Sequence, residues 1–188
     1  MKKILLCVVG LIAGIPASPA LAEKKYGPGV TDTEIKIGQT MPYSGPVSAY
    51  GTIGKTEVAY FKMVNDRGGI NGRKINLISL DDGYSPPKTI EQVRKLVEQE
   101  EVFALFQTLG TAPNNAIVKY TNSKQVPNIF IGAIAEKLGD AEAYPWTLPW
   151  NPTGVLEGTQ QAHWLIKERP KAKIALLYQN DDLGKDFA

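Results

Sequence analysis

Residues 74–106 read KINLISLDDGYSPPKTIEQVRKLVEQEEVFALF, and their pattern is the clearest indication of the fold class. The first seven of these residues are mostly apolar and predict a strand, which ends at the turn residues 81–84. Ser85 then precedes two prolines, a pattern typical of a helix start, and apolar residues at helical spacing follow. Residues 102–106 form a continuous apolar run, as expected of a strand covered on both faces. The stretch therefore predicts one strand–helix–strand unit.

The same alternation of strands and helices continues along the chain from residue 35 onward. Parallel strands need a crossover of a dozen or more residues, usually a helix, and these spacings supply one. Right-handed crossovers place helices on both faces, so the sequence predicts an α/β fold with a doubly wound parallel sheet. In such sheets a ligand lies beyond the carboxyl ends of the strands. Further strands are predicted at residues 35–39, 128–131 and 173–178, further helices at 52–65, 115–123, 153–167 and from 181, and a turn at 109–114.

The first 22 residues have the features of a cleaved secretory signal peptide. Met1-Lys2-Lys3 gives the positive start, residues 4–15 are apolar, and Ala20-Leu21-Ala22 forms a small-residue cleavage site. The apolar run is shorter than the roughly 20 residues that span a bilayer. We therefore expect an exported, periplasmic protein with no membrane insertion after cleavage.

Composition excludes several classes of function. The chain has 21 basic and 19 acidic residues, and two of its lysines lie in the signal peptide, so the remainder is nearly neutral. Nucleic-acid binding needs a basic face, and we expect none. The only cysteine, Cys7, also lies in the signal peptide, and His163 is the only histidine. A thiol nucleophile and a multi-histidine metal site are thereby excluded, and no cofactor is expected.

The motif PWTLPW at residues 145–150 predicts a domain boundary. After it, the helix at 153–167 and the strand at 173–178 make only half of a strand–helix–strand unit, with an unpaired apolar edge. We therefore expect part of a longer, two-lobed protein; the alternative is that residues 173–178 join the first sheet. The predicted divisions are a signal peptide at 1–22, an extended leader at 23–34, an N-terminal α/β lobe at 35–148, and the hinge crossing with a truncated second lobe at 149–188.

Three patterns allow catalytic or metal-binding alternatives. Residues 49–56, AYGTIGKT, fit a permissive phosphate-loop pattern, but they begin well after the preceding strand, whereas such a loop follows its strand at once. Asp81-Asp82 is an acidic turn with no visible third metal ligand. His163 lacks the nucleophile and orienting group of a hydrolase triad. A nucleotide hydrolase remains the weaker alternative, and we expect no enzyme.

Two loops instead have the character of a binding site. Residues 43–51, which include Ser44 and Tyr50, carry hydroxyl groups, free backbone N–H groups and aromatic rings after the first strand. Residues 110–114, which begin Gly110-Thr111-Ala112, combine a hydroxyl with backbone N–H groups at a helix start. Such donors suit a carboxylate, and Tyr50 could cover the apolar part of a ligand. The two loops together favour binding over catalysis.

Short segments distributed along the chain carry a family resemblance. They are IKIG (35–38), SGP (44–46), YG (50–51), NDRGGING (65–72), LDD (80–82), GT (110–111), PWT (145–147) and YQNDDLG (178–184). In this order they resemble the substrate-binding proteins of branched-chain amino acid-type ABC transporters, over about residues 35–188. The resemblance implies the periplasmic-binding-protein type I fold, with two α/β lobes that close on a small molecule and deliver it to a membrane permease.

The resemblance also implies roles for individual residues. Tyr50 matches the aromatic residue against the ligand side chain, and Gly110 and Thr111 match the loop that holds its carboxylate. Ile134 and Glu136 fall in the loop that receives the amino group, although Glu136 replaces a hydroxyl residue there. Leu183 stands where an aromatic residue of the second lobe commonly stacks.

The expected function is the extracytoplasmic solute-binding component of an ABC importer. Its solute would be a small carboxylate, such as a branched-chain amino acid or a related organic or aromatic acid, and its partner a membrane permease. The alternative is a ligand-sensing module that uses the same lobe to regulate a partner. With the second lobe only begun, we expect the 188-residue chain to bind its solute weakly or not at all.

Overall fold

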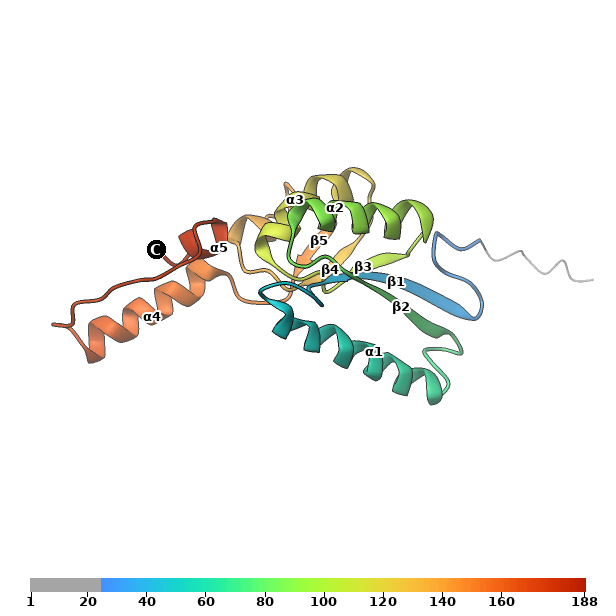
Figure 1. Cartoon of the computed structure of the whole chain (residues 1–188), viewed down its shortest axis with the longest axis horizontal. Coiled ribbons are helices and arrows are strands. Elements are labelled where there is room, and N and C mark those ends of the chain that lie inside the picture. Colours follow the sequence, from blue (N-terminus) through green and yellow to red (C-terminus); the bar gives the residue numbers. More distant parts are fainter. Residues whose placement is uncertain (1–24) are drawn as a thin grey trace, which may run out of the picture.

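The computed structural model describes residues 25–188, which form a five-stranded parallel sheet with helices on both faces (Figure 1). The signal peptide predicted at residues 1–22 lies outside this range. The strand order is β2-β1-β3-β4-β5, with every neighbouring pair parallel. The predicted α/β class and doubly wound parallel sheet are confirmed. The strands are β1 (Glu34–Met41), β2 (Lys74–Asp81), β3 (Ala104–Phe106), β4 (Asn128–Ile131) and β5 (Thr147–Pro149).

The helices divide between the two faces as right-handed crossovers require. Helix α1 (Gly51–Asp66) lies on one face, and α2 (Pro86–Arg94) and α3 (Thr111–Ser123) lie on the other (Figure 1). A π-helical turn, η2 (Lys95–Gln99), continues α2. One apolar cluster packs α2, η2 and α3 against the sheet, and its buried members are Val93, Leu96, Val102, Leu105 and Ile117.

Helix α3 begins four residues earlier than the sequence predicted. Residues 111–114 were expected to be part of a turn, but the helix starts at Thr111 directly after Gly110. Pro113 does not prevent this, because backbone N–H groups in the first turn have no helical partner in any case. The Asn114 side chain donates to the carbonyls of Gly110 and Thr108, at 2.8 and 3.0 Å, and so fixes this start.

The end of the sheet also differs from expectation. The predicted crossing at residues 145–150 contains β5, which pairs with β4. The strand predicted at 173–178 is wrong, because residues 173–178 form no strand and Leu177 is fully exposed. A strand exists only where a neighbour completes its hydrogen bonds, and no described strand lies beside this segment.

Helix α4 (Gly154–Glu168) and the segment after it extend away from the sheet (Figure 1). Thr153 caps α4 as predicted, since its hydroxyl accepts a hydrogen bond from the Leu156 N–H at 3.3 Å. The chain then returns to the sheet edge through α5 (Asp182–Lys185). In residues 25–188 no helix combines the length and the apolar character needed to cross a membrane.

A polar network lies under α1, between that helix and the sheet. The side chain of Gln39, which is fully buried on β1, donates to Glu57 of α1 and accepts a hydrogen bond from Ser79 of β2 at 2.7 Å. Burial raises the pKa of Glu57, and the hydrogen bond from Gln39 only partly opposes this. A buried carboxyl that holds its proton more tightly in the folded chain stabilises the fold at low pH and loses that contribution as the pH rises.

We therefore expect Glu57→Gln to flatten the pH dependence of stability above pH 4.5, the ordinary pKa of this carboxyl. The amide keeps an acceptor for Gln39 without burying a charge, so the free energy of unfolding at neutral pH should rise by under about 1 kcal/mol. Urea unfolding of both chains between acidic and neutral pH measures this. An unchanged difference between the two chains across that range would show that Glu57 titrates as an ordinary surface group.

Candidate functional site

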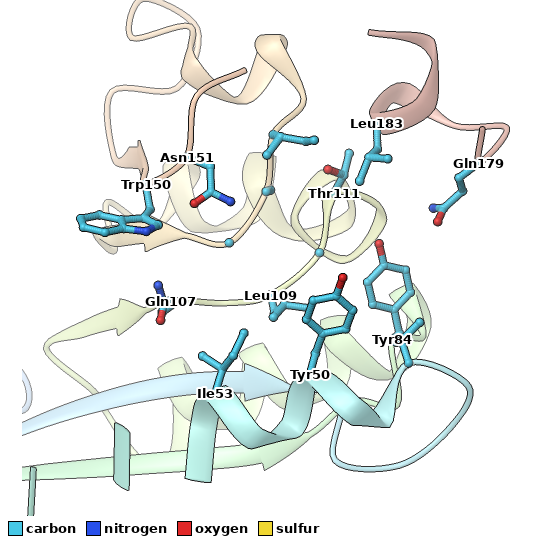
Figure 2. Close-up of a pocket in the computed structure, with 15 residues that line it drawn as sticks. Tyr50, Ile53, Tyr84, Gln107, Leu109, Thr111, Trp150, Asn151, Gln179 and Leu183 are labelled. Carbon is cyan, nitrogen blue, oxygen red and sulfur yellow. The ribbon is translucent and has the colours of Figure 1, made fainter. Parts of the chain in front are cut away.

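A cavity with a volume of about 500 Å³ lies at the carboxyl edge of the sheet. It is close to the point between β1 and β3 where the direction of the crossovers changes, which is the usual ligand position in this strand order. Figure 2 shows its walls. None of its lining residues carries a charged side chain. They are Val47, Tyr50, Ile53, Tyr84, Gln107, Leu109, Gly110, Thr111, Gly132, Ala133, Ile134, Trp150, Asn151, Gln179 and Leu183.

The start of α1 forms one wall. A 3₁₀ turn, η1 (Ser48–Tyr50), leads directly into α1 and places Tyr50 and Ile53 at the cavity (Figure 2). Tyr50 is 56% exposed, so much of its ring can still be covered by a ligand. The phosphate-loop alternative does not fit this wall, because β1 ends at Met41 and Lys55 lies exposed within the helix.

The start of α3 forms the polar floor of the cavity. Gly110 has φ +104°, a conformation that side chains strongly disfavour, and its N–H donates to the Gly132 carbonyl at 3.0 Å. Thr111 is fully buried, and its hydroxyl is one of the buried polar groups of residues 25–188 that have no hydrogen-bond partner. A buried hydroxyl without a partner costs free energy, and the positive end of a helix dipole beside it favours an anion. The floor can therefore accept a carboxylate.

Tyr84 lines the cavity, although its sequence context predicts only a turn. Its backbone has φ +60°, which is rare for a bulky residue, and its N–H donates to the Asp82 carboxylate at 2.9 Å. Its ring lies against Gly110, since a Cβ at that glycine would come within 2.4 Å of Tyr84 Cε2. Burial raises the pKa of the Tyr84 hydroxyl, although hydrogen bonds from the Gln179 side chain and the Thr111 backbone oppose this.

The acidic turn Asp81-Asp82 is structural. Asp81 accepts hydrogen bonds from the backbone N–H groups of Tyr43, Ser44 and Gly83, at 2.9, 3.1 and 3.0 Å, and from the Ser44 hydroxyl at 2.6 Å. It also pairs with Lys88 at 2.9 Å. The Ser44 hydroxyl and the other donors hold the pKa of Asp81 well below its usual range. Ser44 therefore ties its loop to β2 and does not line the cavity.

Asp82 supports the turn from inside. It is fully buried and accepts from the Thr89 hydroxyl at 2.8 Å and from the Tyr84 N–H. Burial raises its pKa. Ser85 was predicted to cap α2, but its side chain makes no capping bond, and only its carbonyl accepts hydrogen bonds from Thr89.

Across residues 25–188 there is no group of three His, Cys, Asp or Glu side chains placed to hold a metal.

The far wall comes from the crossing after β4 and from α5. Trp150 stacks edge-on against Phe130, with ring centroids 5.9 Å apart. In α5, Asp182 accepts a hydrogen bond from Asn115 at 2.8 Å and pairs with Lys137, and that lysine lowers the pKa of the carboxyl. These contacts hold Leu183 at the cavity (Figure 2).

The structure brings together five of the eight predicted site residues, namely Tyr50, Gly110, Thr111, Ile134 and Leu183. Ser44, Ala112 and Glu136 do not line the cavity. Glu136 begins the 3₁₀ turn η3 (Glu136–Gly139), is exposed, and donates its backbone N–H to Asp186 at 2.8 Å. The ligand-binding roles of all eight stay predictions. Lining residues that were not predicted as site residues include Tyr84, Gln107, Trp150, Asn151 and Gln179. Three of them had a signal in the sequence: Tyr84 lies in a turn at the carboxyl end of a predicted strand, Trp150 in the aromatic motif 145–150, and Gln179 in the family segment 178–184.

Comparison with known proteins identifies the family of the chain and agrees with the fold described above. The family model described as "Periplasmic binding protein" matches residues 34–188. The Leu/Ile/Val-binding protein homolog 7 of Brucella suis is 28% identical over 98% of this chain and 45% of its own length. The chain thus spans about half the length of the curated relatives it matches.

Two solved structures share the fold. A branched-chain amino acid ABC transporter protein of Thermus thermophilus with bound valine has a TM-score of 0.74 and 19% identity, over 84% of this chain and 41% of its own. The fatty acid ABC transporter substrate-binding protein of Thermomonospora curvata has a TM-score of 0.73 and 26% identity, over 87% of this chain and 41% of its own.

Proposed function

Because the chain belongs to the periplasmic binding protein family, we propose that it binds a small carboxylate solute at the carboxyl edge of its sheet. It would serve outside the cytoplasm as the solute-binding component of an ABC importer and hand the solute to a membrane permease. Its action would be binding and release, with no bond made or broken.

One observation carries this proposal. The Thr111 hydroxyl is buried at a cavity of about 500 Å³ and has no partner within residues 25–188. Buried polar groups are nearly always hydrogen-bonded, so a group left unpaired at a cavity wall suggests a ligand that completes it. The group lies in the first turn of α3, where the helix dipole favours a negative charge.

The uncharged walls of the cavity indicate which class of ligand it suits. Tyr50, Ile53, Leu109 and Trp150 offer apolar surface, and the amides of Gln107, Asn151 and Gln179 offer neutral hydrogen bonds. The relatives are named for branched-chain amino acids and for fatty acids, which share a carboxylate and an apolar body. A carboxylate with an apolar body is therefore the class that we propose.

We also propose the domain division at residue 149. The sheet and its covering helices end with β5, whereas the apolar side chains after α4 stay exposed, as Ile174, Leu176 and Leu177 show. Exposed apolar stretches of this kind need a covering surface, which a second lobe would supply. Closure of such a lobe would bury most of the ligand, as in typical ligand sites.

The test is an amide-detected NMR titration of the 188-residue chain with L-leucine, benzoate and octanoate. At least one carboxylate should shift the signals of Gly110, Thr111 and Ala112, with a dissociation constant weaker than about 1 mM because only one lobe is complete. Thr111→Val should abolish these shifts. Thr56→Val is the matched control, since that hydroxyl bonds to the Thr52 carbonyl within α1.

Three results would contradict the proposal or the expectations attached to it. Absence of any shift at residues 110–112 with all three acids would overturn carboxylate binding at this edge. An unchanged titration of Thr111→Val would overturn the role of the hydroxyl. Binding tighter than about 1 mM would contradict the expectation that a second lobe is needed.

A further inference from the structure

Tyr84 occupies a costly backbone conformation that the surrounding structure maintains. A bulky residue at φ +60° is strained, and such residues cluster at functional sites. The buried Asp82 carboxylate accepts a hydrogen bond from the Tyr84 N–H at 2.9 Å and another from the Thr89 hydroxyl at 2.8 Å. The result is a ring that passes over Gly110 and reaches the start of α3 (Figure 2).

The Tyr84 hydroxyl lies between the two walls of the cavity. It lies close to Thr111 on the floor and to the Gln179 side chain on the opposite wall, and both of these residues line the cavity (Figure 2). A phenol that accepts hydrogen bonds still has its own proton to donate. Asp181 is a nearby carboxylate, but its oxygens already accept from Gln179 and from the Gly184 N–H.

We propose that Tyr84 is a specificity-determining residue of this site, whose hydroxyl donates its proton to an acid oxygen of the ligand. The proposal rests on the proposed function. Because Tyr84 packs against Gly110 and lines the same cavity as Thr111, the ligand carboxylate meets the phenol and the unpaired Thr111 hydroxyl as a pair of O–H donors. A donor pair favours a carboxylate oxygen over an amide or an ammonium group at this point, since charge-assisted hydrogen bonds are the stronger ones.

The experiment compares Tyr84→Phe with the unmodified chain, using whichever of L-leucine, benzoate and octanoate binds best, and the primary amide of that acid. The phenylalanine ring preserves packing on Gly110 and removes only the hydroxyl. We expect the carboxylate to lose about tenfold in affinity, while the amide loses little. Tyr60→Phe is the matched control, because Tyr60 is an exposed tyrosine of α1 that does not line the cavity.

The outcomes separate the two proposals. Equal loss for acid and amide would assign Tyr84 to packing alone, and no loss for either would remove it from the site; both overturn the specificity role and leave carboxylate binding intact. If the unmodified chain binds none of the three acids, the proposed function fails, and the role of Tyr84 fails with it.

Discussion

Replacing Gly110 by alanine should abolish carboxylate binding and lower the free energy of unfolding by about 2–4 kcal/mol. Gly110 has φ +104°, a conformation that alanine adopts only with strain. The added Cβ would also lie 2.4 Å from Tyr84 Cε2 and 2.9 Å from Pro113 Cδ. The substitution would therefore displace both the tyrosine ring and the start of α3, which hold the two hydroxyl donors of the site.

Gly68→Ala is the matched control for this substitution. Gly68 has φ +107°, almost the same as Gly110, but a Cβ there would meet no atom within 4 Å. Urea unfolding should show a loss of about 1–2 kcal/mol from backbone strain in Gly68→Ala, with the NMR titration unchanged. Equal stability losses in the two variants, together with normal ligand titration of Gly110→Ala, would show that the close packing at Gly110 is unimportant.

Replacing Asp81 by alanine should lower the free energy of unfolding by about 2–3 kcal/mol. The change removes a carboxylate that accepts hydrogen bonds from Tyr43, Ser44, Gly83 and Lys88. The bonds from Tyr43 and Ser44 join the loop after β1 to β2. Because this loop leads into the turn that carries Tyr50, carboxylate binding should weaken as well. Urea unfolding and the same NMR titration measure the two effects.

The pH dependence gives a second signature of Asp81. Its pKa in the folded chain lies below the ordinary value of 3.8, so its contribution is complete above that value and is lost as the pH falls through the folded pKa. Acid unfolding of Asp81→Ala should therefore be less steep below pH 3.8. Asp66→Ala is the control, since this exposed carboxylate pairs only with Lys62 one helical turn away and should change little. If the stability of Asp81→Ala falls as steeply with acid as that of the unmodified chain, Asp81 does not contribute to the pH dependence of folding.

Local patterns in the sequence were sufficient for most of the sheet. Apolar runs and helix-start signals placed β1, β2, α1, α2 and α4 within a few residues, because each of these elements has its own apolar periodicity. Long-range pairing was harder to predict. The apolar run at 173–178 has the composition of a strand but no described neighbour, and β5 is a strand only because β4 lies beside it.

The site residues also divide into those with a local sequence signal and those that depend on long-range contacts. The loops before α1 and α3 were predicted because strand ends of a parallel sheet meet at one edge, and Tyr50, Gly110 and Thr111 do line the cavity. Ser44 was not recognised as a partner of Asp81, because that contact joins residues far apart in the sequence. Tyr84 was missed because a left-handed tyrosine has no sequence signature; its position follows from Asp82, Thr89 and Gly110 together.

Carboxylate binding at the sheet edge is tested most directly by a crystal structure of this chain grown with the best-binding carboxylate at saturating concentration. We expect density for the acid at the carboxyl edge of the sheet, with one oxygen within hydrogen-bond distance of Thr111 Oγ1 and its apolar body against Tyr50. A structure that shows the acid bound elsewhere, or the Thr111 hydroxyl still unpaired beside an empty cavity, would contradict it.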